Sequence, residues 1–541
     1  MYSWHFPSTG MAGMLHTAPQ ASSNLLNHSS YAVPLRAYNS SLLGIEGLDL
    51  YAFDTRGDGW RWVATTNPFT AKAGVQHVSP SFTSLPRGGS MVRYRLHLPL
   101  YNGIANLSIG VGGTGAVLQS DTTLRTSKKP VVWYGTSIAQ GGVASRPGMA
   151  FTNIIARRID REVLNFGLSG NCLMEPGVAQ WLAQIDAAAF IIDCSWNMSP
   201  AMIANRTVPL VRQLRAAAPS TPIVLVEDTE DGTAWAVPAA KVLQADKRTN
   251  LAAAYATLTN ASGSPDGHLF YVTGPQLYNW SKRVGGVQRA VISPTVGGCH
   301  PTDLGMVAIA DYYSKTLPTI LNDDEWQRPS KVDVRDVTVA TASRADPEQA
   351  YHHEAALTSL VTESRKSDAR EISSDPSVAW TPVGRTGGLG VMGRAFNSTA
   401  TGEYFDRLPA TAKDVVRDAV WELSRDATGM FVPFETNAAD IYVHYVLDEP
   451  AEPLWHMPQS GTSGADLFRL DEERGAYRFV NAMRPQAGTT TQSARIVSGL
   501  APVASHRFLL FLPLRAHIVN ASIGVPKSAY LKRDEGFSAD G

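Results

Sequence analysis

The chain has 541 residues, of which 44% are hydrophobic and 18% are charged, and its formal net charge is −1. This length predicts several domains of about 100–200 residues each, with apolar cores of ordinary size. The balanced charge gives no support for nucleic acid or an anionic membrane as a partner, and no apolar run reaches the ~18 residues of a membrane span.

Three cysteines, Cys172, Cys194 and Cys299, are too few for a disulfide scaffold. We interpret them as small buried residues near a pocket, with one disulfide plus a free thiol as the alternative. Frequent glycosylation acceptor sites favour a secretory route, although no signal peptide opens the chain. The sites begin at Asn27, Asn39, Asn106, Asn197, Asn205, Asn260, Asn279, Asn397 and Asn520.

Two parts of the chain repeat each other. Residues 94–111 (YRLHLPLYNGIANLSIGV) align without a gap to residues 508–525 (FLLFLPLRAHIVNASIGV). Further upstream in each part, GLDLY corresponds to GADLF and WHFP corresponds to WHMP, in residues 47–51 and 464–468 and in residues 4–7 and 455–458. Three matches in the same order predict a duplicated domain.

Both copies show the alternation of β-strands, as in ADIYVHYV at 439–446. Short strands between Gly/Pro turns predict a β-sandwich or jelly roll. We place the first sandwich at 1–120, with an insert at 14–43 that we interpret as a loop or a gene-model artefact. The second sandwich is predicted at 377–530. Residues 531–541 are predicted to form a disordered tail.

The first copy has no counterpart of residues 377–453, so we expect it to lack N-terminal strands. Its open sheet edge would then be covered by the second copy or by another chain. We also expect the true N-terminus, with its signal peptide, to lie upstream of Met1. In the second copy, helical spacing at 410–424 is the one exception to the β pattern.

Between the two copies, residues 130–322 alternate between strand and helix patterns, which predicts a doubly wound α/β domain with a parallel sheet. Residues 323–376 are charged and lose apolar periodicity, which predicts a flexible linker. The expected strands are 130–134, 162–166, 188–193, 222–227 and 268–272. The expected helices are 149–159, 177–185, 202–218, 250–260 and 301–321.

Ser137 follows the first buried strand of this domain, at the edge where α/β sheets bind ligands. After the second strand, Gly170 allows a backbone N–H to point into the same crevice, and a tight turn is an equal interpretation. After the third strand, Asn197 could offer its amide to an oxyanion or cap the next helix. His300 stands on a Gly-rich loop before the last helix, from which a base would reach Ser137.

Together these motifs resemble the four blocks of the SGNH (GDSL-type) hydrolase superfamily. The matching segments are GTSI at 135–138, SGN at 169–171, Asn197 and HPTDLG at 300–305. GLDLY at 47–51 resembles the signature of the GxDLY β-sandwich that precedes the hydrolase in one subgroup. The fold class implied is a flavodoxin-like α/β hydrolase flanked by two β-sandwiches.

The resemblance implies a role for each site residue. Ser137 would be the nucleophile and His300 the general base. The N–H groups of Ser137 and Gly170 would form the oxyanion hole together with the side-chain amide of Asn197. The family usually has an aspartate three residues before its histidine, where this chain has Gly297. A backbone carbonyl could orient His300 instead, Asp228 could substitute, or the site could be impaired.

The sequence thus predicts a serine esterase for a small acyl ester, plausibly on a carbohydrate, with two alternatives. One is an acyltransferase, and the other is a catalytically impaired protein that binds a glycan or another partner. We predict no cofactor and no metal, because no ligand cluster has metal spacing and the glycine run at 110–115 lacks the P-loop lysine. Asp303 is expected in the first turn of the last helix, where capping explains it.

Overall fold

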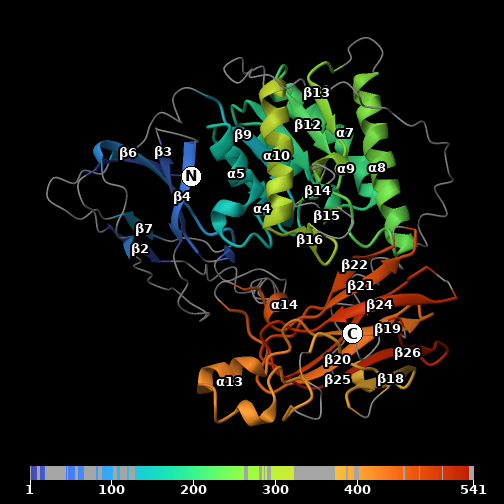
Figure 1. Cartoon of the computed structure of the whole chain (residues 1–541). Helices are drawn as coiled ribbons and strands as arrows, with labels where there is room; N and C mark the ends of the chain where they lie inside the picture. The colour runs from blue at the N-terminus through green and yellow to red at the C-terminus, as the bar shows by residue number, and fades with distance from the viewer. Residues whose placement is uncertain are drawn as a thin grey trace.

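The computed structural model describes three successive units of the chain, a β unit, an α/β unit and a second β unit (Figure 1). Most of the predicted linker, residues 323–371, lies outside the described residues. The residues that the structure describes are 2–8, 13–18, 44–45, 47–54, 59–65, 81–82, 88–101, 106–109, 119–120, 128–260, 266–278, 283–284, 287–288, 294–321, 372–385, 388–394, 396, 401–454, 457–473, 475–501, 504–534 and 536.

The α/β unit is built on one five-stranded parallel sheet with the order β10-β9-β11-β12-β13. Numbered along the domain this is the order 2-1-3-4-5, which is the flavodoxin-like arrangement expected from the sequence. The strands are β9 (Val131–Gly135), β10 (Val163–Gly167), β11 (Ala189–Asp193), β12 (Ile223–Val226) and β13 (Leu269–Val272). All five match expected strands within one or two residues.

Helices cover both faces of this sheet because successive side chains of a strand point to opposite faces. On β9, Trp133 packs with the α5, α9 and α10 layer, and Tyr134 packs with the α6, α7 and α8 layer. Helix α8 begins well before the expected residue 250. The helices are α4 (Ser137–Gln140), α5 (Phe151–Arg158), α6 (Pro176–Leu182), α7 (Pro200–Ala217), α8 (Pro238–Thr259), α9 (Gly274–Leu277) and α10 (Asp303–Ile320).

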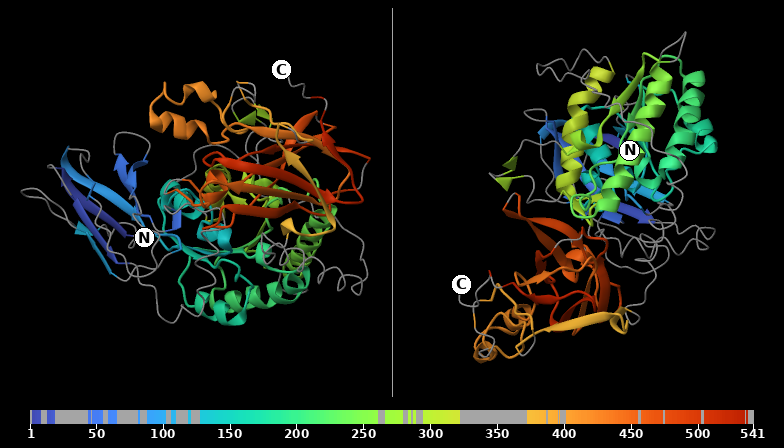
Figure 2. Two further views of the ribbon diagram at one scale, coloured as in Figure 1. Left: turned by 90° about the horizontal axis from the view of Figure 1, so that it is seen from below. Right: turned by 90° about the vertical axis from the view of Figure 1, so that its right-hand side faces the viewer.

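The first β unit contains a five-stranded sheet, β4-β3-β6-β1-β8, and a three-stranded sheet, β5-β2-β7. The second contains a five-stranded sheet, β22-β21-β24-β19-β26, and a four-stranded sheet, β18-β25-β20-β23. Figures 1 and 2 place the two units against different parts of the α/β domain.

The strands of the first unit are β1 (Tyr2–Ser8), β2 (Gly13–Ala18), β3 (Asp49–Asp54), β4 (Gly59–Thr65), β5 (Ser81–Phe82), β6 (Gly88–His97), β7 (Asn106–Ile109) and β8 (Gln119–Ser120). Those of the second are β18 (Val378–Val383), β19 (Phe431–Thr436), β20 (Ile441–Leu447), β21 (Asp466–Asp471), β22 (Ala476–Ala482), β23 (Thr491–Val497), β24 (His506–Phe511), β25 (Ile518–Pro526) and β26 (Leu531–Arg533).

The pairing registers show how the two units correspond. Tyr51 lies opposite Trp62 and Arg95, and in the second unit Phe468 lies opposite Phe479 and Leu509. Both β3–β4 and β21–β22 have an irregularity at the same place, just before the aromatic residue. The gapless alignment of the repeat therefore holds at the level of individual strand pairs.

The expectation about missing N-terminal strands needs a correction. Strand β1 pairs with β6 as β19 pairs with β24. The first unit therefore has a counterpart of β19, which lies in the segment 377–453 that was expected to have none. In the second unit the matching WHMP stretch instead leads into the short helix α14 (Gln459–Thr462), so the two motifs are not structurally equivalent. In the second unit β18 pairs with β25, the strand that corresponds to β7. Among the described residues of the first unit, no strand takes the place of β18 beside β7.

Three further expectations are corrected by strand pairing or helix breaks. Strand β2 takes up the start of the predicted insert, because residues 15–18 pair with β7, while residues 19–43 lie outside the described residues. Residues 531–533 of the predicted tail pair with β19. The expected helix at 410–424 is divided into the 3-10 turn η7 (Ala410–Ala412) and helix α13 (Asp418–Ser424).

The GLDLY signature docks the first sandwich onto the α/β domain. The buried carboxylate of Asp49 accepts hydrogen bonds from the Arg146 guanidinium and from the Gly148 N–H at 2.9 Å. The Arg157 guanidinium lies 3.9 Å from the centre of the Tyr51 ring. Burial raises the pKa of Asp49 although Arg146 opposes the shift. The pair therefore fixes the docking geometry more than it adds stability.

We expect Asp49→Asn to lower the midpoint of the first calorimetric unfolding transition by about 5 °C or more. The reason is that one carboxylate oxygen accepts from Trp62 and the other accepts from Arg146 and Gly148. An asparagine must therefore turn its NH₂ group toward a donor.

Asp466→Asn in the second sandwich is the matched control. Burial raises the pKa of Asp466 to about 6, so the folded protein carries a desolvated charge above that pH. The variant should be as stable as the wild type or more stable at pH 7.5, and the difference should vanish toward pH 4. Equal destabilisation by both substitutions at pH 7.5 would contradict this account of docking.

Candidate active site

The carboxyl ends of three neighbouring strands coincide. Gly135, the last residue of β9, pairs with Gly167 at the end of β10 and with Asp193 at the end of β11. The segments that follow these strands therefore emerge at one edge of the sheet, at the point where the strand order changes direction. Open α/β sheets bind ligands at this edge.

Ser137 is the first residue of α4 and is held rigidly there. Strand β9 is buried along its whole length, and the Thr136 hydroxyl accepts a hydrogen bond from Ile138 N at 3.3 Å. The Ser137 side chain is largely buried, and its Oγ lies 2.8 Å from His300 Nε2. This separation is within reach of proton transfer between a hydroxyl nucleophile and a base.

His300 lies on a tight hairpin between β16 (Thr295–Val296) and β17 (His300–Pro301), where it pairs with Val296. The expected loop is thus a short strand, and α10 begins two residues later than predicted. Gly297 and Gly298 form the turn in the left-handed region, with φ of +65° and +81°. A Cβ at Gly142 would lie 3.3 Å from His300 Cδ2, so that glycine leaves room for the imidazole.

Gly170 and Asn197 follow β10 and β11 as the sequence predicts. Gly170 has φ +72° and open space around it. Among the described residues no acceptor receives its N–H, and the buried Oδ1 of Asn197 has no partner. The alternative role of Asn197 as a helix cap is wrong, because Ser199 caps α7 by accepting from Met202 N at 3.2 Å. Asn197 belongs to the short turn η3 (Ser195–Asn197).

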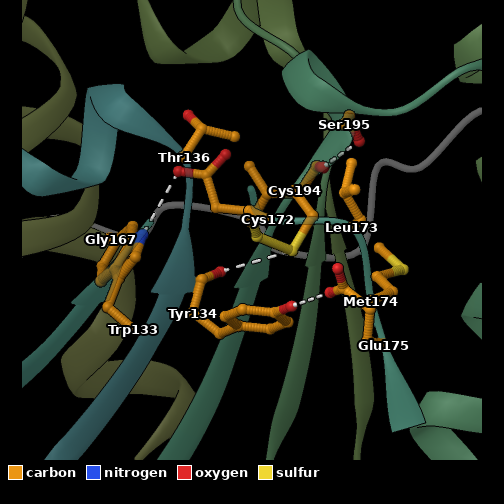
Figure 3. The surroundings of a disulfide bond; sticks show 12 residues. Trp133, Tyr134, Thr136, Gly167, Cys172, Leu173, Met174, Glu175, Cys194 and Ser195 are labelled. Atoms are coloured by element: carbon orange, nitrogen blue, oxygen red, sulfur yellow. Dashed lines mark hydrogen bonds between the residues drawn. A yellow bond between two sulfur atoms is a disulfide. The ribbon is translucent and has the colours of Figure 1, made fainter. Parts of the chain in front are cut away.

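A disulfide links the segments that carry these two residues. Cys172 and Cys194 are fully buried and bonded to each other, and Cys299 remains a free thiol. Figure 3 shows the bond beside Tyr134 of β9. The alternative of one disulfide and one free thiol is therefore the correct interpretation. Burial raises the pKa of the Cys299 thiol to about 12, which leaves it unreactive at neutral pH.

One supporting residue was not found from the sequence. Gln140, at the end of α4, accepts from Ser169 N at 3.0 Å and donates to the Leu100 carbonyl at 3.1 Å. It thereby joins the Ser137 helix to the Gly170 segment and to the first sandwich. No sequence pattern marks this glutamine, because its partners are backbone atoms of distant segments.

Two aspartates considered as orienting groups have other partners. The carboxylate of Asp228 accepts from Arg248 Nε at 3.3 Å, and burial raises its pKa. A role for Asp228 in orienting His300 stays a prediction. Asp303 accepts from both N and Oγ of Ser145, at 2.8 and 2.5 Å, so it tethers the loop after α4. Asp303 lies in the first turn of α10 as expected, but its carboxylate binds Ser145.

Gly297 faces the second sandwich. A Cβ built on it would lie 3.3 Å from an Arg484 guanidinium nitrogen and 3.5 Å from Asn481 Oδ1.

Under the sheet edge, burial raises the pKa of Asp193 to about 7, and Trp133 Nε1 donates to this carboxylate at 3.2 Å. In the described part of the chain no cluster of three or more His, Cys, Asp or Glu side chains could hold a metal ion.

The comparison with known families agrees with this arrangement. Residues 128–318 match the GDSL-like Lipase/Acylhydrolase family. Residues 12–116 and 378–531 both match the GxDLY family, the N-terminus of SGNH-hydrolase-type esterases. The α/β domain therefore belongs to the GDSL-like lipases and acylhydrolases, which are carboxylic ester hydrolases, and it is flanked by two GxDLY sandwiches. No curated protein sequence matches the chain significantly.

The chain is similar to several solved structures. One is a GDSL-like lipase from Bacteroides ovatus, with 28% identity, 59% of this chain and 84% of that chain covered, and a TM-score of 0.48. The salicylyl-acyltransferase SsfX3 from a tetracycline biosynthetic pathway has 18% identity, coverage of 59% and 81%, and a TM-score of 0.43. A family two carbohydrate esterase from Clostridium thermocellum has 13% identity, coverage of 59% and 92%, and a TM-score of 0.39. No helix among the described residues is long and apolar enough to cross a membrane.

The disulfide predicts a specific thiol count. In denaturant without reductant, each chain should expose one thiol to Ellman's reagent, and after reduction it should expose three. Replacing the bonded pair by serines should destabilise the α/β domain by about 3 kcal/mol, because the bond closes a 22-residue separation. Cys299→Ser is the control and should remove the single free thiol. Three thiols before reduction would contradict the assignment.

Proposed function

We propose that this chain hydrolyses small acyl esters, with Ser137 as the nucleophile and His300 as the general base. The observation that carries the proposal is the 2.8 Å separation of Ser137 Oγ and His300 Nε2 at the sheet edge. A serine hydroxyl is a weak nucleophile by itself, and an adjacent imidazole activates it by taking its proton. The GDSL-like family match supports the same reaction class.

In this mechanism Ser137 Oγ attacks the ester carbonyl carbon while His300 Nε2 accepts the hydroxyl proton. The negative charge on the carbonyl oxygen is stabilised by the N–H groups of Ser137 and Gly170 and by the Asn197 amide. His300 then returns the proton to the leaving alkoxide, and the acyl-enzyme forms. Water then gives a proton to the same imidazole and attacks the acyl carbon. His300 returns this proton to Ser137 Oγ as the Oγ–acyl bond breaks and the acid leaves.

Position 297 carries no side chain that could orient the imidazole, so in this proposal a backbone carbonyl or Asp228 orients His300. We propose a carbohydrate as the alcohol of the substrate. An alcohol that replaced water in the second step would make the enzyme an acyltransferase. The buried disulfide and the acceptor sites support an oxidising, extracytoplasmic location.

Kinetics with p-nitrophenyl acetate and with acetylated xylan and mannan test the proposal. Ser137→Ala and His300→Ala should each lower kcat by at least about 10³-fold, because the nucleophile and its base act as one unit. The matched controls are Ser220→Ala and His268→Ala. Both residues are exposed, so these variants should keep wild-type rates. A purified wild-type protein that turns over none of these esters would indicate the impaired, partner-binding alternative.

The geometry at Gly297 gives a further prediction. We expect Gly297→Asp to change kcat by less than about threefold, because its carboxylate would meet Arg484. Both this variant and the matched Gly297→Asn variant should lose about 1 kcal/mol of stability from the left-handed backbone. A gain of about 100-fold in kcat for the aspartate variant alone would contradict this, since it would show that the carboxylate orients His300.

A further inference from the structure

One loop of the α/β domain reaches the second sandwich. This loop, residues 229–237, follows β12 and leads into α8, and we call it the strap. In Figure 1, strands β21 and β22 of the second sandwich face the end of the α/β domain where β16 lies. Hydrogen bonds of the strap connect these two regions.

The inner end of the strap contacts the neighbours of two site residues. Thr229 Oγ1 accepts a hydrogen bond at 2.9 Å from Nε1 of Trp196, the residue before Asn197. Gly232 N donates at 2.8 Å to the carbonyl of Gly298, in the hairpin that carries His300. The packing is tight, because a Cβ at Gly232 would lie 3.0 Å from Gly298 Cα.

The middle of the strap is fixed by its own side chains. Asp231 Oδ1 accepts from Thr233 N at 2.8 Å and from Thr233 Oγ1 at 2.7 Å. Gln244 of α8 accepts from Asp231 N at 3.3 Å and donates to the Thr229 carbonyl at 2.8 Å. A displacement of one end of so constrained a loop is therefore transmitted to the other end.

The outer end of the strap is embedded in the second sandwich. Trp235 Nε1 donates to the Phe479 carbonyl at 3.0 Å, and its ring packs against Arg469 and Arg478, whose Cζ atoms are 4.2 and 4.3 Å from the ring centre. Ala236 is 1% exposed and belongs to the hydrophobic core of that sandwich. Its carbonyl accepts from Ala501 N at 3.3 Å.

We propose that the second sandwich positions the active site through the strap, with Trp235 and Ala236 as positioning residues. When the sandwich is docked, the strap holds the His300 hairpin and the Asn197 turn at their separation from Ser137. Loss of docking releases both segments. This inference deepens the proposed esterase function and rests on it, because it assigns the docked sandwich a role in that reaction.

The test uses the full chain with Ala236→Glu, which places a charge in the sandwich core and so prevents docking. We expect kcat for p-nitrophenyl acetate to fall about tenfold or more, with KM within about threefold, because small misplacements of reacting groups slow the chemical step. Amide hydrogen exchange should accelerate in peptides covering 195–198 and 295–301. Exchange in α5 should stay as in the wild type, and the radius of gyration should increase.

Trp235→Ala is the second variant and should change kcat and exchange in the same direction. Trp235→Phe keeps an aromatic ring against the two arginines, so it should retain most of the activity. Trp181→Ala is the matched control, because Trp181 is 69% exposed on α6, and it should behave as the wild type.

Unchanged kcat and exchange in both Ala236→Glu and Trp235→Ala would overturn the inference, whatever the radius of gyration. Faster exchange in α5 as well would also overturn it, because it would indicate general destabilisation. A lower kcat with unchanged exchange at 195–198 and 295–301 would do the same. If the wild-type protein has no esterase activity, the proposed function fails by itself, and the exchange measurement still decides whether the sandwich positions the two segments.

Discussion

The site depends on one constraint, which is that β9, β10 and β11 end in register. Gly135 pairs with Gly167 on one side and with Asp193 on the other, so the segments after the three strands start from the same edge. The buried β9 fixes the place of Ser137, and the disulfide between Cys172 and Cys194 links the other two segments. Only His300 comes from a distant part of the chain, on a hairpin that needs separate support.

The two sandwiches contact the α/β domain in different ways. In the first, Asp49 binds Arg146, close to the Ser145–Asp303 contact at the start of α10. In the second, no described residue donates a hydrogen bond to the side-chain carboxylate of the equivalent Asp466. The positions of Tyr51, Arg95 and His97 hold Phe468, Leu509 and Phe511. The second copy therefore has no equivalent polar docking face, and it contacts the α/β domain through the strap and through residues near Gly297.

Much of this arrangement could be predicted from the sequence. Alternation between strand and helix patterns predicted the parallel sheet, and Ser137, Gly170 and Asn197 each follow the expected strand. The Ser137–His300 proximity was predicted by resemblance and appears in the geometry. Helix α8 was predicted too short because its first turns, 238–249, carry few apolar residues at helical spacing.

Long-range contacts explain what the sequence did not reveal. Strand β1 is recognised by its pairing with β6 and β8, since its motif resembles a segment with a different conformation in the second copy. Gln140 acts through backbone atoms, and the strap acts through single contacts of Thr229, Gly232 and Trp235 with separate partners. Such contacts have no local sequence pattern.

Activation of Ser137 by His300 is tested by mapping the adduct of a fluorophosphonate by mass spectrometry. A serine is phosphonylated rapidly only when a neighbouring base activates it. Activation of Ser137 by His300 predicts a single adduct on Ser137 in the wild type and none in His300→Ala after the same exposure. An unlabelled Ser137 in the folded wild-type protein, or equal labelling with and without His300, would contradict this activation.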